Sequence, residues 1–180
     1  MLSAREVVEL LGLRPLAREG GFFRETYRST AQAPDPQSKT QNPKSAGTAI
    51  YYLLTPDTFS ALHRLPFDEI FHFYLGDPVT MLQLHPDGSS EIITLGTGIE
   101  RGECVQVIVH AGTWQGSFLA TVGEHDPDPK RIGSCPSRFA LMGTTVAPGY
   151  DPKDYEAGDR QRLIDSHPAQ RDLILRLTRP

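Results

Sequence analysis

Cysteine is scarce in this chain of 180 residues, which contains only Cys104 and Cys135. Two cysteines without CxxC spacing provide no disulfide framework, and they favour a reducing compartment. No apolar run approaches the ~18–20 residues that a membrane-spanning helix needs, so no membrane partner is expected. The N-terminal segment has acidic residues within its apolar stretch and does not resemble a signal peptide. These absences predict a cytoplasmic protein.

Clusters of basic residues are also absent. The 18 Lys and Arg residues are scattered singly against 22 Asp and Glu residues, and the formal net charge is −4. A nucleic-acid partner is therefore not expected, because a phosphate backbone requires a basic stripe. The motifs GxSxG, GxxxxGK[ST] and HExxH are missing as well, which removes the common hydrolase, nucleotide-binding and zinc-protease signatures.

Hydrophobic and turn residues predict one mainly β domain over residues 1–180. The segment after Ser3 has the pattern of a capping box and predicts a short helix over 4–11, and residues 159–178 return to helical spacing. Between them lie eight or nine short strands, with turn signals every 8–12 residues, as in a β-sandwich or barrel. The polar, proline-containing segments 31–47 and 123–137 are predicted loops.

The stretch SALHRLPFDEIFHFYLGD, residues 60–77, holds the strongest candidates for chemistry. Side chains alternate between the two faces of a strand. His63 is therefore expected on one face with Ala61, pointing inward. In the following strand Glu69 is expected to point inward and His72 outward, unless a bulge intervenes.

The spacing of this stretch resembles the first motif of the cupins, a jelly-roll superfamily. That motif has His-x-His, a Glu four residues later and a Gly seven residues after the Glu; here these positions are His63, Leu65, Glu69 and Gly76. In the second motif, Gln115 stands where cupins have a further His. The chain as a whole resembles the uncharacterised cupin-5 group (domain of unknown function 985) in the segments EGGFFRETYRS, TAIYYLL, LHRLPFDEIFHFYLGDP, HAGTWQG and TTVAPGYDPKDYE.

This resemblance implies a double-stranded β-helix, the cupin jelly roll, which is usually a homodimer and is related in shape to the nucleotide-sugar 3,5-epimerases. In those epimerases a His at the position of His63 is the general base and a Tyr is the acid. They carry a Lys where this chain has Glu69, and an ionised carboxylate would repel an enolate. Burial would raise the pKa of Glu69 and make it a proton donor.

Metal binding is the alternative. A catalytic metal site normally offers three or four His or carboxylate ligands. Here His63 and Glu69 are good ligands, Gln115 is a poor one, Leu65 cannot ligate, and His72 joins only if a bulge turns it inward. No cofactor is therefore expected, and a divalent ion held by His63, Glu69, His72 and Gln115 remains the alternative.

Other polar and aromatic residues suit a pocket for a small-molecule ligand such as a sugar. Alternation places Glu25 and Tyr27 on one face, and it allows only one of Tyr51 and Tyr52 to line the barrel. The predicted ligand-binding residues are Glu25, Tyr27, Tyr51, Gln106, Trp114 and Gln115.

Three functions remain open at this point. The first is a metal-independent isomerase or epimerase that acts on a carbohydrate or nucleotide-linked sugar, with His63 and Glu69 as catalytic residues. The second is a metal-dependent cupin enzyme. The third is a non-catalytic small-molecule binding protein, or a His63–Glu69 pair that is only a buried structural contact.

Overall fold

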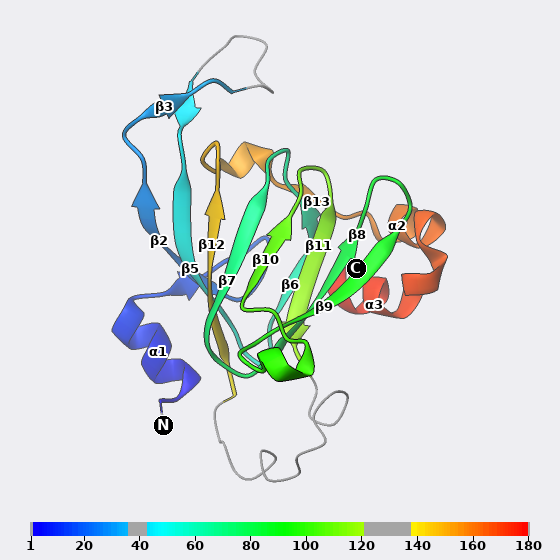
Figure 1. Cartoon of the computed structure of the whole chain (residues 1–180), viewed down its shortest axis with the longest axis horizontal. Helices are drawn as coiled ribbons and strands as arrows, with labels where there is room; N and C mark the ends of the chain where they lie inside the picture. The colour runs from blue at the N-terminus through cyan, green and yellow to red at the C-terminus, as the bar shows by residue number, and fades with distance from the viewer. Residues whose placement is uncertain (1, 36–42, 121–137, 180) are drawn as a thin grey trace.

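Two antiparallel β-sheets face each other across an apolar core, as the computed structural model shows (Figure 1). The structure describes residues 2–35, 43–120 and 138–179. The first sheet runs in the order β1 (Arg14–Pro15), β2 (Phe22–Arg28), β5 (Thr48–Leu54), β12 (Ala140–Val146), β7 (Glu69–Gly76) and β10 (Gln106–Val109). The second runs in the order β13 (Glu156–Ala157), β6 (Phe59–Arg64), β11 (Trp114–Leu119), β8 (Val79–Leu84) and β9 (Ser90–Leu95). The predicted mainly β jelly roll is confirmed.

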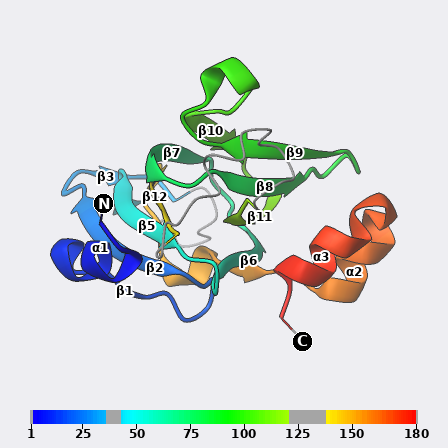
Figure 2. The ribbon, with the colours of Figure 1, turned by 90° about the horizontal axis from the view of Figure 1, so that it is seen from below.

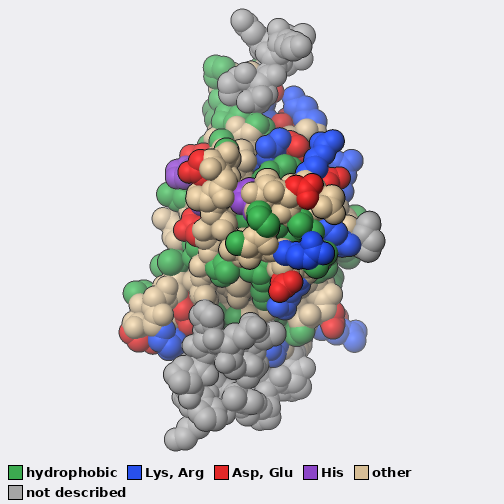
Figure 3. Space-filling view, turned by 90° about the vertical axis from the view of Figure 1, so that its right-hand side faces the viewer, with side chains coloured by type: hydrophobic (Ala, Val, Ile, Leu, Met, Phe, Trp, Pro, Cys, Tyr) green, Lys and Arg blue, Asp and Glu red, His purple; other side chains and the backbone are tan. Residues whose placement is uncertain are grey.

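Short helices cover the outer faces of both sheets (Figure 2). Helix α1 (Ala4–Leu11) begins at the predicted capping box, in which the Ser3 hydroxyl accepts the Glu6 amide N–H, and Val7 packs on Leu53 of the first sheet. Helices α2 (Arg160–Ser166) and α3 (Arg171–Leu177) bury Leu163 and Ile174 against the second sheet. On the side seen in Figure 3, Lys and Arg side chains lie beside Asp and Glu side chains. No helix in the described ranges is long and apolar enough to cross a membrane.

Alternation over residues 69–73 of β7 builds the core between the sheets. Phe71 and Phe73 point inward and are buried, and they pack with Tyr52 from β5 and Met81 from β8. Their neighbours on the opposite face are partly or fully exposed. Because the inner and outer positions of β7 follow the pleat, Glu69 at its first position enters the barrel on the same side as the two phenylalanines.

Three register shifts interrupt the pairing of the described strands, and two of them lie in strands that line the cavity described below. In β2 the register with β5 shifts between Glu25 and Tyr27, and the extra residue, Thr26, donates its hydroxyl to the Ala49 carbonyl at 3.1 Å. A second shift lies between β6 and β11, where Gln115 pairs with His63 but Ser117 pairs with Ser60. A bulge inserts one residue and so reverses the alternation beyond it.

The predicted loop over 31–47 lies partly outside the described residues. Its described ends form a two-stranded hairpin of β3 (Gln32–Ala33) and β4 (Lys44–Ser45). The predicted loop over 123–137, with Cys135, lies outside the described residues except at its border. Lys44 is buried and forms an ion pair with the buried side chain of Asp154 in the 3₁₀-helix η3 (Pro152–Asp154). This ion pair ties the hairpin to the segment that follows β12.

Replacing Lys44 tests how much its ion pair with Asp154 contributes to the stability of the protein. Lys44→Met leaves the Asp154 carboxylate buried without its cation, so the free energy of unfolding should fall by about 3 kcal/mol. Arg5→Ala is the control, because Arg5 pairs with Glu9 on the exposed face of α1 and should leave stability nearly unchanged. Urea unfolding of both variants measures this, and equal small effects would contradict a structural role for the pair.

Candidate functional site

A cavity of about 360 Å³ opens at one end of the barrel. Its buried part carries His63, Glu69 and Thr144, and exposed arginines lie at its mouth. The complete lining is Arg14, Leu16, Ala17, Arg18, Glu19, Phe23, Glu25, Arg28, Thr48, Ile50, His63, Leu65, Glu69, Thr144, Val146, Tyr150, Pro152 and Tyr155. A pocket with mostly apolar walls and a few converging polar groups is typical of a small-molecule site.

His63 is held rigidly in this cavity. Its side chain is 2% exposed, and Nδ1 lies 2.7 Å from the Ala61 carbonyl oxygen. A carbonyl oxygen can only accept, so Nδ1 carries a hydrogen and donates it. In the neutral ring, Nε2 therefore holds the lone pair, and the Gln115 side-chain Nε2 donates to it at 2.9 Å. The ring also stacks on Tyr155, with centroids 4.8 Å apart. The fixed tautomer presents Nε2 as the basic nitrogen.

Glu69 enters from β7 beside His63, as the alternation predicts. The Gln115 amide also donates to Glu69 Oε2, at 3.3 Å. Burial, and after it the carboxylate of Glu19, raises the pKa of Glu69 to about 7, although His63, Thr144 and Gln115 act in the opposite direction. The expected proton donor character of Glu69 is thus supported, because a carboxyl group with this pKa carries its proton for much of the time near neutral pH.

Glu19 is a second carboxylate beside His63, which the sequence analysis did not select. Its Oε2 lies 3.8 Å from His63 Nε2, and its Oε1 accepts the Ser60 hydroxyl at 2.8 Å. Gly20 makes this placement possible. It has φ +112°, and a Cβ there would lie 2.1 Å from the Phe59 carbonyl oxygen, so only glycine allows this close approach of the backbone.

Two tyrosines of the segment 150–155 line the cavity, and one of them, Tyr155, covers His63. Burial, followed by the charge of Glu19, raises the pKa of Tyr150 and of Tyr155 to about 12. Both hydroxyls therefore keep their protons near neutral pH and can donate a proton or a hydrogen bond. Tyr155 is half of the stack on His63, so the segment 150–155 completes the site.

Of the predicted ligand-binding residues, Glu25 alone lines the cavity. Gln115 lies behind it and acts through His63 and Glu69. The expectation that Tyr27 shares the face of Glu25 is wrong, because the bulge at Thr26 turns Tyr27 outward, where it is 58% exposed. The same bulge brings Arg28 inward, and it forms an ion pair with Glu25 at 2.7 Å.

Three other predicted residues lie outside the barrel. Tyr51 packs in the cluster beneath α1, and Tyr52 takes the inner position instead. Trp114 packs toward the C-terminal helices with Arg64 over its ring at 4.5 Å. Since Gln115 points inward, its strand neighbour Trp114 has to point outward. Gln106 lies on the outer face of the first sheet.

The four residues considered for a metal do not all face the cavity. His72 points outward, as alternation predicts, and its Nδ1 lies 3.2 Å from the amide nitrogen of Gln106. The alternative set that includes His72 is therefore wrong. Both nitrogens of His63 are engaged by protein groups, and Leu65 is aliphatic. Within 2–35, 43–120 and 138–179, no group of three or more His, Cys, Asp or Glu side chains is arranged to hold a metal ion.

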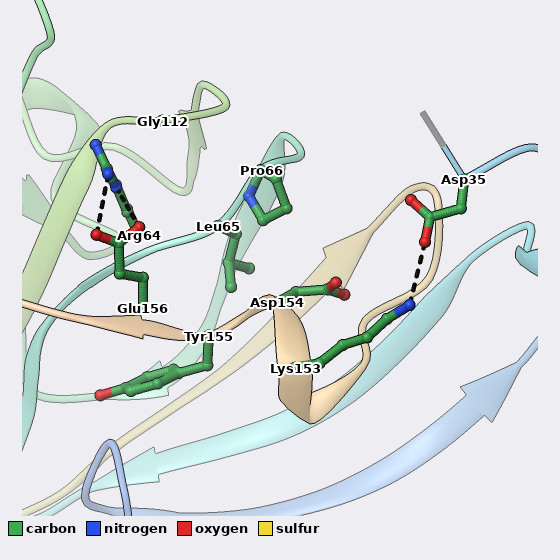
Figure 4. Close-up of a pocket in the computed structure, with 9 residues that line it drawn as sticks. All are labelled: Asp35, Arg64, Leu65, Pro66, Gly112, Lys153, Asp154, Tyr155 and Glu156. Carbon is green, nitrogen blue, oxygen red and sulfur yellow. Dashed lines mark hydrogen bonds and ion pairs between the residues drawn. The ribbon is translucent and has the colours of Figure 1, made fainter. Parts of the chain in front are cut away.

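A second, outer cavity of about 610 Å³ lies beside the first, and the two share Leu65 and Tyr155 in their linings (Figure 4). Its charged side chains are already paired. Arg64 donates to both oxygens of Glu156 at 2.8 and 3.0 Å, and Lys153 pairs with Asp35 at 3.2 Å. These ion pairs hold the segment that carries Tyr155 against the barrel.

The residues that the sequence analysis missed come from elements distant in sequence. Glu19 precedes β2, whereas Tyr150 and Tyr155 follow β12. All three lie within segments that carry the family resemblance, EGGFFRETYRS and TTVAPGYDPKDYE. Their position in these two segments was the only sequence feature that could have pointed to them. Neither alternation nor motif spacing shows that the two segments meet at His63.

Proteins with similar sequences or structures extend over most of the chain. The family model described as cupin superfamily (DUF985) matches residues 5–158. A hypothetical protein from Leishmania major is 27% identical with a TM-score of 0.84, covering 99% of this chain and 100% of that one. Protein SO0799 from Shewanella oneidensis is 29% identical with a TM-score of 0.81, covering 100% and 99%. The uncharacterized protein YML079W of Saccharomyces cerevisiae is 29% identical over 145 residues, covering 77% of this chain and 67% of that protein.

The raised pKa of Glu69 makes stability depend on pH. Between pH ~4.5 and ~7 the folded state holds a proton that the unfolded state has lost, so the free energy of unfolding should fall as pH rises through this window. The loss through Glu69 amounts to about 3 kcal/mol at most. Denaturant unfolding of Glu69→Gln should show a stability advantage over the wild type that grows from pH 4.5 to 7. A difference that stays level with pH contradicts the assignment.

Proposed function

Because the chain belongs to the DUF985 family of the cupin superfamily, we propose that its barrel binds a small molecule. In this proposal the protein is a metal-independent isomerase or epimerase that acts on a carbohydrate or nucleotide-linked sugar. One observation carries this proposal. The imidazole of His63, with Nδ1 on the Ala61 carbonyl oxygen, and a carboxyl group with a pKa of about 7 lie in one small cavity, and both are hydrogen-bonded to the same amide. Such a pair suits proton transfer near neutral pH.

The reaction would begin at a carbon next to a carbonyl group. The C–H bond breaks, its proton passes to His63 Nε2, and the electron pair moves onto the carbonyl oxygen as an enolate. The protonated Glu69 donates a hydrogen bond to that oxygen, which a permanently ionised carboxylate would repel. Epimerisation is completed when a proton reaches the opposite face of the carbon from the Tyr150 hydroxyl. Loss of a proton from His63 to solvent and return of one to Tyr150 restore the site.

The size and lining of the cavity also favour a sugar or a nucleotide-linked sugar as the substrate. Its volume of about 360 Å³ lies in the range of small-molecule sites. Phe23 and Ile50 contribute apolar walls, and the exposed Arg14 and Arg18 also line the cavity. Neither arginine has a carboxylate partner among the described ion pairs. A sugar ring against the walls, with a phosphate at the mouth, fits this distribution of charge.

Deuterium exchange tests the proposed reaction. In D₂O, candidate keto sugars and their nucleotide conjugates should incorporate deuterium at a carbon next to the carbonyl, as seen by NMR. His63→Asn should slow this exchange at least 100-fold, as expected for loss of a general base. His72→Asn is the matched control, because the second histidine of the same stretch points out of the barrel, and it should exchange at the wild-type rate.

Three results contradict the proposal. Exchange that survives His63→Asn would show that His63 is not the general base. Exchange that is abolished by a chelator and restored by a divalent ion would show a metal-dependent enzyme. Tight binding of a sugar conjugate without exchange identifies a non-catalytic binding protein. Circular dichroism of both variants separates a lost base from a lost fold.

The resemblance to a dimeric group and one exposed apolar surface support a homodimer as partner. Tyr74, Leu75, Val105 and Ile108 are exposed on neighbouring strands and loops around β7 and β10. Exposed apolar groups clustered in this way are typical of an interface. Sedimentation should give a dimer for the wild type and a monomer for Ile108→Asp. Ile92→Asp, on the second sheet, should stay dimeric, and a monomeric wild type would contradict the proposal.

A further inference from the structure

Gln115 occupies an unusual position between the two groups of the proposed proton-transfer pair. Its side-chain nitrogen lies 2.9 Å from His63 Nε2 and 3.3 Å from Glu69 Oε2. A primary amide has two hydrogens on this nitrogen, so one can be donated to each partner. The residue is 1% exposed and does not line the cavity. A ligand therefore meets His63 and Glu69, while Gln115 supports both from behind.

The orientation of this amide is determined by its partners. Nδ1 of His63 donates to the Ala61 carbonyl, so in the neutral ring Nε2 can only accept. The opposite orientation would place the amide oxygen against this lone pair. With both hydrogens donated, Oε1 has no hydrogen-bond partner among the described residues. An unpaired buried acceptor costs free energy, and the two donated bonds offset this cost.

Apart from Gln115, the polar groups beside His63 include two carboxyl groups. The Glu19 carboxylate lies 3.8 Å from Nε2, and Glu69 shares the amide. The other groups at this end of the cavity are the phenols of Tyr150 and Tyr155 and, in the barrel, of Tyr52, which keep their protons because burial raises their pKa values. Arg18, at the mouth, is exposed to solvent. Nearby carboxylates stabilise an imidazolium, and an imidazolium cannot accept a proton.

We propose that Gln115 is a positioning residue that holds His63 as a neutral base, by donating one amide hydrogen to Nε2 and the other to Glu69. A protonated Nε2 would direct its hydrogen at the hydrogen of the amide, so the amide disfavours the charged ring. The second bond directs any proton on Glu69 to the other oxygen, away from Gln115. This inference rests on the proposed function for its biological meaning, but the protonation states it assigns are measurable without a substrate.

The amide must give way when a substrate proton reaches Nε2. The bond to Glu69 Oε2 is kept when the side chain turns and its contact with His63 Nε2 is replaced by the substrate. Gln115 itself gains and loses no proton in this step. At position 115, a side chain that can only accept hydrogen bonds, such as an ionised Glu, would stabilise the imidazolium form of His63. An apolar side chain there would leave nothing to counteract the stabilisation of the imidazolium by Glu19 and Glu69.

Nitrogen NMR of ¹⁵N-histidine-labelled protein tests the inference directly. At pH 7 the wild type should show His63 with a protonated Nδ1 and an unprotonated Nε2. Gln115→Met, which removes both donors at similar volume, and Gln115→Glu should show both ring nitrogens protonated. Gln83→Met is the matched control, because Gln83 is the cross-strand neighbour of Gln115, is equally buried and does not contact His63. Its His63 signals should match those of the wild type.

A second readout excludes a merely structural role. Gln115 lowers the pKa of Glu69 by hydrogen bonding, so Gln115→Met should move the carboxyl titration of Glu69 to higher pH, while Gln83→Met should not. The rate of substrate deuterium exchange should fall at least tenfold in Gln115→Met, and a folded protein by circular dichroism should accompany it. These effects together are not expected from a loss of packing.

The outcomes separate this inference from the proposed function. A wild-type His63 that is already charged at pH 7, or a His63 that stays neutral in Gln115→Met, overturns the inference even if exchange occurs. If no substrate exchanges but the nitrogen signals behave as described, the proposed reaction fails and the positioning role of Gln115 stands.

Discussion

The burial of the Glu69 carboxyl beside His63 is the constraint on which the rest of the site depends. A carboxylate in an apolar barrel loses hydration, and the neighbouring Glu19 opposes its ionisation further. The group therefore titrates near pH 7 rather than near 4.5, at a cost to stability that the surrounding core has to offset. Core side chains of β7 fix where this carboxyl enters, and Gln115 donates a hydrogen bond to it. A strained electrostatic arrangement of this kind is typical of a functional site.

The elements that complete the site are held by interactions outside it. The turn before β2 places Glu19 because Gly20 allows its backbone to lie against β6. The segment after β12 places Tyr155 on His63 because buried Lys44 and exposed Arg64 pair with carboxylates on that segment. The barrel thus provides a rigid wall, and two irregular segments distant in sequence bring the remaining chemistry to it. The fold belongs to a superfamily that supports many reactions, so these particular side chains carry the argument about function.

Much of this arrangement could be predicted from the sequence. The capping box gave α1, and alternation placed His63 and Glu69 inside and His72 outside. It failed in β2, because a bulge at Thr26 leaves no signature in an otherwise regular alternating strand. Alternation could not decide between Tyr51 and Tyr52, because both faces of their strand are covered: one by the core between the sheets and the other by α1. Tertiary contacts such as Glu19 with His63 depend on how distant loops meet, and residue spacing carries no information about this.

The central claim is that the barrel holds a carboxyl group poised to exchange its proton near neutral pH beside a neutral base. Carbon NMR of the side-chain carboxyl of Glu69, followed from pH 3 to 9 and identified by its absence in Glu69→Gln, measures this most directly. The account predicts a titration midpoint of about 7. A midpoint near 4.5, the ordinary value for glutamate, would contradict it, because Glu69 would then be a carboxylate at neutral pH and unable to act as the proton donor of the pair.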